Sequence, residues 1–147
     1  MYEKYLKGIY PITPNEFVSD KIFVENCLRV INTNISVFQF RSKFLSYARR
    51  NRITDLLYRE CQLNNVKLIL NDYDDEVVKY DDIGIHIGFD ADKIKNIRNK
   101  LGGDRIIGIS CYDSLGNARY CEENKASYVS FGSMYKTCLL YTSDAAD

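Results

Sequence analysis

The chain has 147 residues, of which 46% are apolar and 27% charged, and its 20 basic and 20 acidic residues give a formal net charge of zero. This composition is typical of one globular domain, and it argues against a nucleic-acid-binding or membrane protein, because the charge is balanced and no apolar run approaches about 18 residues. The five cysteines have no CxxC spacing and there is one histidine, so we expect reduced thiols in a cytoplasmic protein and no zinc site.

Six short apolar runs alternate with longer segments of helical period. The runs are rich in Ile, Val, Tyr and Phe, and four are almost continuously apolar, which is typical of strands buried on both faces of a parallel sheet. The predicted strands are 7–13, 35–41, 66–71, 82–88, 104–110 and 126–133.

Helices are predicted between these strands. The segments 46–65 and 91–102 carry apolar stripes at helical spacing, and the second ends at Gly102, a residue favoured just after a helix. Asp113 or Ser114 is expected to cap a further helix. The result is a βα repeat of six strands and five helices.

Two architectures fit such a repeat. A doubly wound, flavodoxin-like sheet has about this length, whereas a (β/α)8 barrel needs eight units and typically about 250 residues. Length alone therefore favours the open sheet.

Polar residues follow several of the predicted strands, at the end where parallel α/β folds bind ligands. Gln39, Arg41 and Lys43 alternate at the end of the second strand, so we expect their side chains on one side of it. The other polar residues at strand ends are Asn71, Asp72, Asp90, Asp92, Ser110 and Thr137.

These residue types suit a diphosphate held through Mg²⁺. Arg41 and Lys43 supply a planar fork and a point charge for an anion, and Asp72 with Asp90 or Asp92 supplies the one or two carboxylates that Mg²⁺ takes. Simpler interpretations also stand: the cations can belong to a solvated loop, the "ND" pair to a turn, and the aspartates to helix caps. The only histidine, inside "GIHIG", is expected to be a buried, hydrogen-bonded core residue.

Five motifs in order resemble those of the thiamine-phosphate synthases. They are "QFRSK" (39–43), "LND" (70–72), "GIHIG" (84–88), "IIGIS" (106–110) and "YVSFG" (128–132), and their order and spacing agree over residues 6–137. The resemblance implies a (β/α)8 TIM barrel, which overrides the length argument, with about the first six βα units present in a C-terminally truncated chain.

The resemblance also implies a transferase of thiamine biosynthesis. It would join hydroxymethylpyrimidine diphosphate to thiazole phosphate, giving thiamine phosphate and pyrophosphate, by diphosphate departure that Mg²⁺ assists. The implied site residues are Gln39 and Asn71 for the pyrimidine, Arg41 and Lys43 for the diphosphate, Asp72 for Mg²⁺, Ser110 beside the pyrimidine and leaving group, and Thr137 for the thiazole phosphate. The implied catalytic residues are Ser110, Arg41 and Lys43.

The chain departs from the family pattern at three places. Ser42 stands where the family has an acidic residue, and Ala91 stands at a metal-ligand position, so Asp90 or Asp92 would have to replace it. The segment 138–147 lacks the expected threonine and lysine, and it resembles translated sequencing read-through. We therefore predict a partial barrel domain over 1–137 followed by a non-native tail, and an unstable or inactive chain as written.

Two other functions remain open at this point. A thiazole tautomerase-like isomerase on the same barrel would need neither the diphosphate cations nor the Mg²⁺ carboxylate. A non-catalytic barrel fragment or flavodoxin-like binding module would need no site at all.

Overall fold

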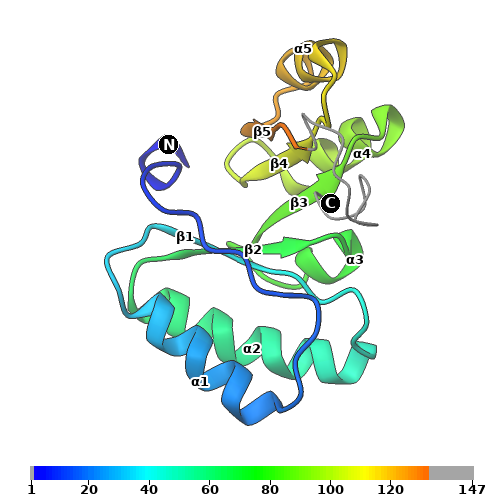
Figure 1. Cartoon of the computed structure of the whole chain (residues 1–147). Coiled ribbons are helices and arrows are strands. Elements are labelled where there is room, and N and C mark those ends of the chain that lie inside the picture. The colour runs from blue at the N-terminus through cyan, green and yellow to red at the C-terminus, as the bar shows by residue number, and fades with distance from the viewer. Residues whose placement is uncertain (1, 133–147) are drawn as a thin grey trace, which may run out of the picture.

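The computed structural model describes residues 2–132. Figure 1 shows a curved sheet with the main helices packed against its outer side. Its strands follow the order of the chain and every neighbouring pair is parallel, whereas the order of a flavodoxin-like sheet reverses at a switch point. The strands are β1 (Val37–Phe40), β2 (Lys67–Asn71), β3 (Gly84–Gly88), β4 (Ile107–Ser110) and β5 (Tyr128–Ser130).

The helices confirm the predicted segments and show how they are capped. Ser114 rather than Asp113 caps the last helix, and Gly102 ends the preceding one with a φ of 74°. The short segment after β2 forms a single turn of helix. The helices are η1 (Tyr2–Tyr5, a 3₁₀ turn), α1 (Asp20–Ile31), α2 (Tyr47–Leu63), α3 (Asp74–Val77), α4 (Ala91–Leu101) and α5 (Leu115–Glu123).

The structure corrects the predicted fold class. Residues 2–132 form a five-stranded parallel half-barrel, not six units of a (β/α)8 barrel. The predicted first strand, 7–13, contributes an isolated bridge between Ile12 and Gln39. The physical reason is Pro11, which has no N–H to donate to a ladder and is poorly tolerated inside a strand.

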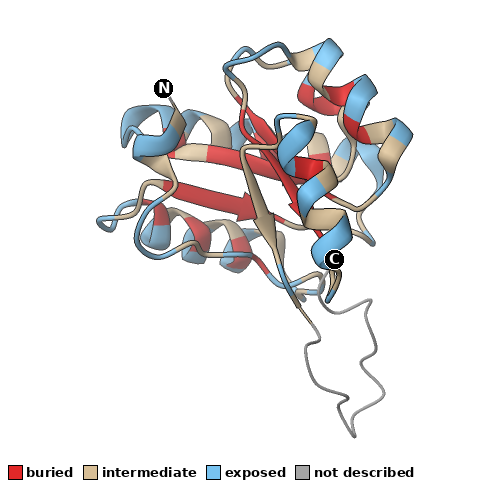
Figure 2. Ribbon diagram, turned by 90° about the horizontal axis from the view of Figure 1, so that it is seen from above, coloured by how far each residue is buried: buried red, intermediate tan, exposed pale blue. Residues whose placement is uncertain are grey.

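The two faces of the sheet differ in chemistry. The outward side chains of β1 to β4, such as Phe38, Leu70 and Ile109, form the main core with the helices. Figure 2 shows these four strands in red and β5, which is less buried, in tan. The inner face has a small apolar cluster around Val37 and Ile69, and polar residues beyond it.

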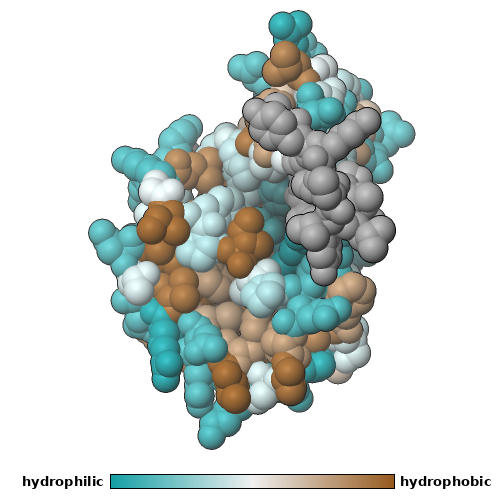
Figure 3. Space-filling model, in the orientation of Figure 1, coloured by the Kyte–Doolittle hydropathy of each residue, from teal (hydrophilic) through white to brown (hydrophobic). Residues whose placement is uncertain are grey.

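The N-terminal segment and α1 carry exposed apolar side chains. Figure 3 shows brown side chains over these elements. Ile12, Val18 and Ile22 are all more than half exposed, and they line a hollow of about 390 Å³ between the N-terminal segment and α1. No helix within residues 2–132 has both the length and the hydropathy needed to cross a membrane.

Candidate functional site

Three of the predicted site residues lie on the inner face of the half-barrel. Gln39, Asn71 and Ser110 belong to three different strands, and each occupies an inward position of the alternation that Val37 and Ile69 define. All three are 2% exposed or less. The structure therefore gathers these polar side chains near the C-terminal ends of the strands, where the sequence placed them.

A chain of hydrogen bonds runs across this face. Gln39 Nε2 donates to the hydroxyl of Tyr10 at 3.0 Å, and that hydroxyl lies 2.5 Å from the hydroxyl of Tyr128. Tyr128 lies 2.9 Å from Nδ1 of His86, so the predicted buried, hydrogen-bonded histidine is confirmed. Burial raises the pKa of both tyrosines, which keeps their hydroxyls protonated.

Tyr10 and Tyr128 are not among the site residues expected from the sequence. One signal was present: Gly108 pairs with Tyr128 on the neighbouring strand, and a glycine at an inward position leaves space for a large partner. A Cβ on Gly108 would lie 2.0 Å from Cζ of the Tyr128 ring.

One polar atom of the inner face has no partner. Within residues 2–132, Oδ1 of Asn71 is buried and accepts no hydrogen bond. Ser110, by contrast, accepts a hydrogen bond from Ser130 Oγ at 3.4 Å. Buried acceptors in folded proteins nearly always accept a hydrogen bond. An unpaired acceptor on a polar face is therefore suited to bind a donor group of a ligand.

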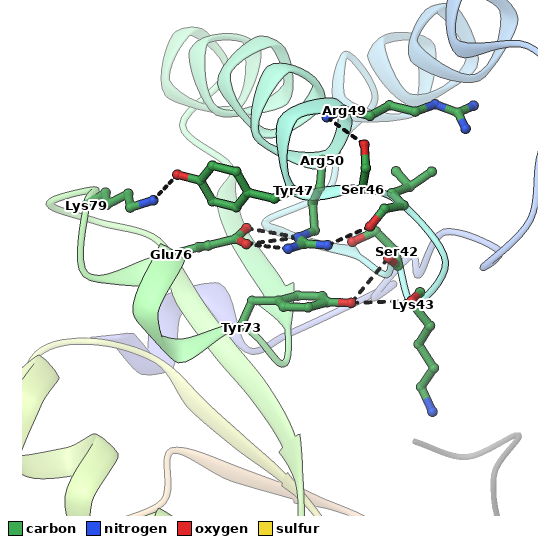
Figure 4. Close-up of polar contacts among 10 residues, drawn as sticks. Ser42, Lys43, Ser46, Tyr47, Arg49, Arg50, Tyr73, Glu76 and Lys79 are labelled. Atoms are coloured by element: carbon green, nitrogen blue, oxygen red, sulfur yellow. Dashed lines mark hydrogen bonds and ion pairs between the residues drawn. The ribbon is translucent and has the colours of Figure 1, made fainter.

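Arg41 and Lys43 follow β1, which ends at Phe40, and both are half-buried. The backbone at Arg41 is fixed by Thr13, a buried residue whose Oγ1 accepts from Arg41 N–H at 2.8 Å and donates to Arg41 O at 3.1 Å. Figure 4 shows the Lys43 side chain extending away from the neighbouring polar network. The loop thus presents at least one cation beyond the end of the strand.

The predicted carboxylates line two neighbouring hollows. Asp72 follows β2 with a φ of 64°, its N–H donates to His86 O at 2.8 Å, and it lines a hollow beside α3. Asp90 and Asp92 line the next hollow, at the start of α4. Asp90 is a helix cap, because its Oδ1 accepts from Lys93 N–H at 2.9 Å.

Asp74, which lines both hollows, forms ion pairs with two lysines. Lys100 Nζ lies 3.1 Å from its Oδ2 and Lys93 Nζ lies 3.7 Å from its Oδ1. Burial alone would raise the pKa of Asp74, but these lysines outweigh it and the pKa lies below its ordinary value. The described part of the chain contains no group of three or more His, Cys, Asp or Glu placed to hold a metal ion.

Thr137 and the segment 138–147 lie outside the described residues, so the structure does not test their predicted roles.

Comparison with known proteins gives consistent matches. The family model described as thiamine monophosphate synthase matches residues 9–139. The thiamine-phosphate synthase of Nitrosomonas eutropha is 33% identical over 130 residues, which cover 88% of this chain and 61% of that protein. The one from Xanthomonas campestris pv. campestris is 31% identical over 140 residues, covering 95% and 67%.

A solved structure shares the fold. It is described as thiamine phosphate pyrophosphorylase from Pyrococcus furiosus, with a TM-score of 0.70 and 22% identity over 86% of this chain and 60% of that one. The chain spans about 60% of the length of several curated relatives. With the family model matching most of its residues, the chain belongs to the thiamine monophosphate synthase family.

Proposed function

We propose that the protein is a thiamine-phosphate synthase, a transferase that joins hydroxymethylpyrimidine diphosphate to thiazole phosphate and releases pyrophosphate. The observation that carries the proposal is the unpartnered, buried Oδ1 of Asn71 on a polar inner face that also holds Gln39. An aminopyrimidine offers an exocyclic N–H donor to Asn71 and ring nitrogens to an amide N–H. The family membership of the chain supports this assignment.

The remaining residues have roles around the diphosphate. Arg41 and Lys43 bind its oxygens and absorb the negative charge that grows as the bond to the pyrimidine methylene carbon breaks. Ser110 lies beside the pyrimidine and the leaving group. Thr137, which follows the described residues, holds the thiazole phosphate.

The residues fit a magnesium site with a single carboxylate. Mg²⁺ takes one or two carboxylates and completes its shell with water and phosphate oxygens, and Asp72 supplies one from a half-exposed position. Asp90 already caps α4 through Oδ1, which leaves its Oδ2 for a metal, and Asp92 is the other candidate for a second ligand. When bound, Mg²⁺ would neutralise diphosphate charge and improve the leaving group.

The chemistry then requires positioning more than proton transfer. The aminopyrimidine stabilises the cation left on its methylene carbon, and the thiazole nitrogen attacks that carbon. The polar face holds the ring in place while the cations screen the leaving group, so no strong base is needed. An isomerase on the same fold would have no use for Arg41, Lys43 and Asp72 together, and is not favoured.

Titration calorimetry with hydroxymethylpyrimidine diphosphate and Mg²⁺ tests the proposal. We expect Asn71→Ala to weaken binding by about tenfold, the effect of one lost buried hydrogen bond, without lowering the melting temperature, because Oδ1 has no partner in the ligand-free chain. Asn99→Ala, an exposed amide on α4, is the matched control and should bind normally. Equal affinity of Asn71→Ala and wild type would contradict the proposal.

A further inference from the structure

A buried ion pair lies beside the candidate site and has no part in the roles described above. Arg50 on α2 and Glu76 on α3 are each 6% exposed. Arg50 Nε donates to Glu76 Oε2 at 2.9 Å, and its Nη2 donates to Oε1 of the same carboxylate. Burying two charges is expensive, and such a pair is often no more stabilising than two apolar side chains of the same volume. Its presence calls for a reason other than stability.

The ion pair joins the two loops that follow β1 and β2. Arg50 Nη1 donates to the carbonyl of Leu45 at 2.9 Å, in the loop between β1 and α2. The ring of Tyr73, in the loop between β2 and α3, lies 3.5 Å from Arg50 Cζ. Figure 4 shows the guanidinium between the Glu76 carboxylate and the loop, with the Tyr73 ring beneath it.

Tyr73 makes a second connection between these loops. Its hydroxyl donates to the carbonyls of Ser42 and Lys43 at 3.4 and 3.5 Å. These distances are long, so each bond is weak by itself, but both fall on the backbone of the residues that follow Arg41. Together with Thr13, whose hydroxyl bonds to the N–H and the carbonyl of Arg41, they fix the backbone at both cations.

The loop after β2 needs such support. Asp72 and Tyr73 have φ values of 64° and 57°, in the left-handed region that residues with a Cβ adopt only at a cost in free energy. The stacking of Tyr73 on Arg50 and the ion pair of Arg50 with Glu76 stabilise this conformation from both ends of α3. The same contacts therefore hold the backbone next to Asp72.

We propose that Arg50, Glu76 and Tyr73 are positioning residues that hold the loop of Arg41 and Lys43 against Asp72, so that the cations and the metal-binding carboxylate meet at one diphosphate. The proposal rests on the proposed function for the identity of that ligand. On this proposal, the two charges are buried, at a cost in free energy, because they place a binding loop. Arg is required at position 50 because its fork reaches Glu76 and Leu45 O at once.

The decisive variant replaces the ion pair by apolar residues. Arg50→Met combined with Glu76→Leu keeps the buried volume and should keep the fold, but it removes the hydrogen bond to Leu45 O and the cation that stacks on the ring of Tyr73. We expect the affinity for Mg²⁺-pyrophosphate, measured by titration calorimetry on the full chain, to fall about tenfold or more. Amide hydrogen exchange in a peptide spanning 41–46 should become faster, while exchange in β4 stays unchanged.

A second variant covers the case in which the double variant does not fold. Tyr73→Phe retains the ring on Arg50 and removes only the hydroxyl, so we expect about a threefold loss of affinity at an unchanged melting temperature. Tyr80→Phe is the matched control. Its hydroxyl also joins the segment after α3 to α2, by a bond of 2.6 Å to Asp55 Oδ1, but it touches neither loop, and affinity should be unchanged.

The outcomes separate this proposal from the proposed function. If wild type binds Mg²⁺-pyrophosphate and the folded double variant binds it equally well, the pair is merely structural and the positioning role is overturned. Unchanged exchange over 41–46 in the double variant overturns that role as well. If wild type itself does not bind, or Arg41→Ala with Lys43→Ala binds like wild type, the diphosphate site fails and the proposed function fails with it.

Discussion

At the scale of single residues, the inner face depends on Gly108, a residue with no side chain, which leaves room for the large ring of Tyr128 on the next strand. Gly108 is not in a conformation reserved for glycine; it is required because the ring of Tyr128 occupies the space above it. That ring brings its hydroxyl to His86 and Tyr10. A glycine in the sequence motif "IIGIS" therefore has a packing role that reaches the polar chain of the site.

Gly108→Ala should be strongly destabilising. The added Cβ would lie 2.0 Å from the ring, so Tyr128 must move and its hydroxyl must leave His86. We expect the free energy of unfolding in urea to fall by about 2–3 kcal/mol, as for other overpacked cores. Gly103→Ala, where a Cβ meets nothing within 4 Å, is the control and should be neutral. Equal midpoints for the two variants would show that the ring relaxes freely.

At the scale of elements, helix starts are set by local chemistry. Ser19, Ser46, Asp90 and Ser114 each precede a helix and accept a hydrogen bond from its first turn. These bonds satisfy backbone N–H groups that have no partner inside the helix. This is why Ser114 could be proposed from the sequence, with the structure deciding only between it and Asp113.

Ser114→Ala removes the cap of α5. Its Oγ accepts from Asn117 N–H at 3.1 Å, and losing that bond should lower the free energy of unfolding by about 1 kcal/mol. Urea unfolding followed by circular dichroism measures the change. Ser114→Asp supplies another good cap and should restore most of the loss; if it does not, the serine acts by something other than capping.

At the scale of the whole molecule, one contact spans the concave face. Tyr10 lies in the segment beside β1 and Tyr128 lies on β5, 118 residues further along the chain. Their rings meet edge to face with centroids 5.6 Å apart. The contact connects the two sides of the curved sheet. The hydroxyl of Tyr10 also accepts a hydrogen bond from Gln39, so the contact is linked to the site.

A double-mutant cycle with Tyr10→Phe and Tyr128→Phe should give a coupling energy of about 0.5–3 kcal/mol, as for other residues in one hydrogen-bond network. Urea unfolding of the four proteins measures it. A value near zero would mean that the two hydroxyls act independently.

The same pair predicts a loss of stability in alkali. Burial raises the pKa of both tyrosines above the ordinary value of 10.0, so their contribution is complete below that pH and is lost as the pH rises through the folded-state values. We expect the melting temperature above about pH 10 to fall more steeply in wild type than in the doubly substituted chain. An equally steep fall of the melting temperature in both proteins would show that the two tyrosines are not its cause.

The sequence alone determined the elements and the polar residues at the ends of the strands. Strand and helix periods and cap residues are local signals, which is why β1 to β5 and α2, α4 and α5 were predicted within a few residues. The ends of the predicted strands identified Gln39, Asn71 and Ser110 as site candidates, and the structure places all three on the inner face. The error at 7–13 arose because apolar content was weighed above the missing N–H of Pro11.

Only the tertiary structure decided which distant residues meet. The register and curvature of the sheet brought Tyr10 to Tyr128, and the path of the chain through α2 and α3 brought Arg50 to Glu76. The same geometry placed Asp72 in one hollow and Asp90 in another, although the sequence had grouped them. Periodicity tells which way a side chain faces, whereas contacts between elements depend on the three-dimensional path of the chain, which no local pattern encodes.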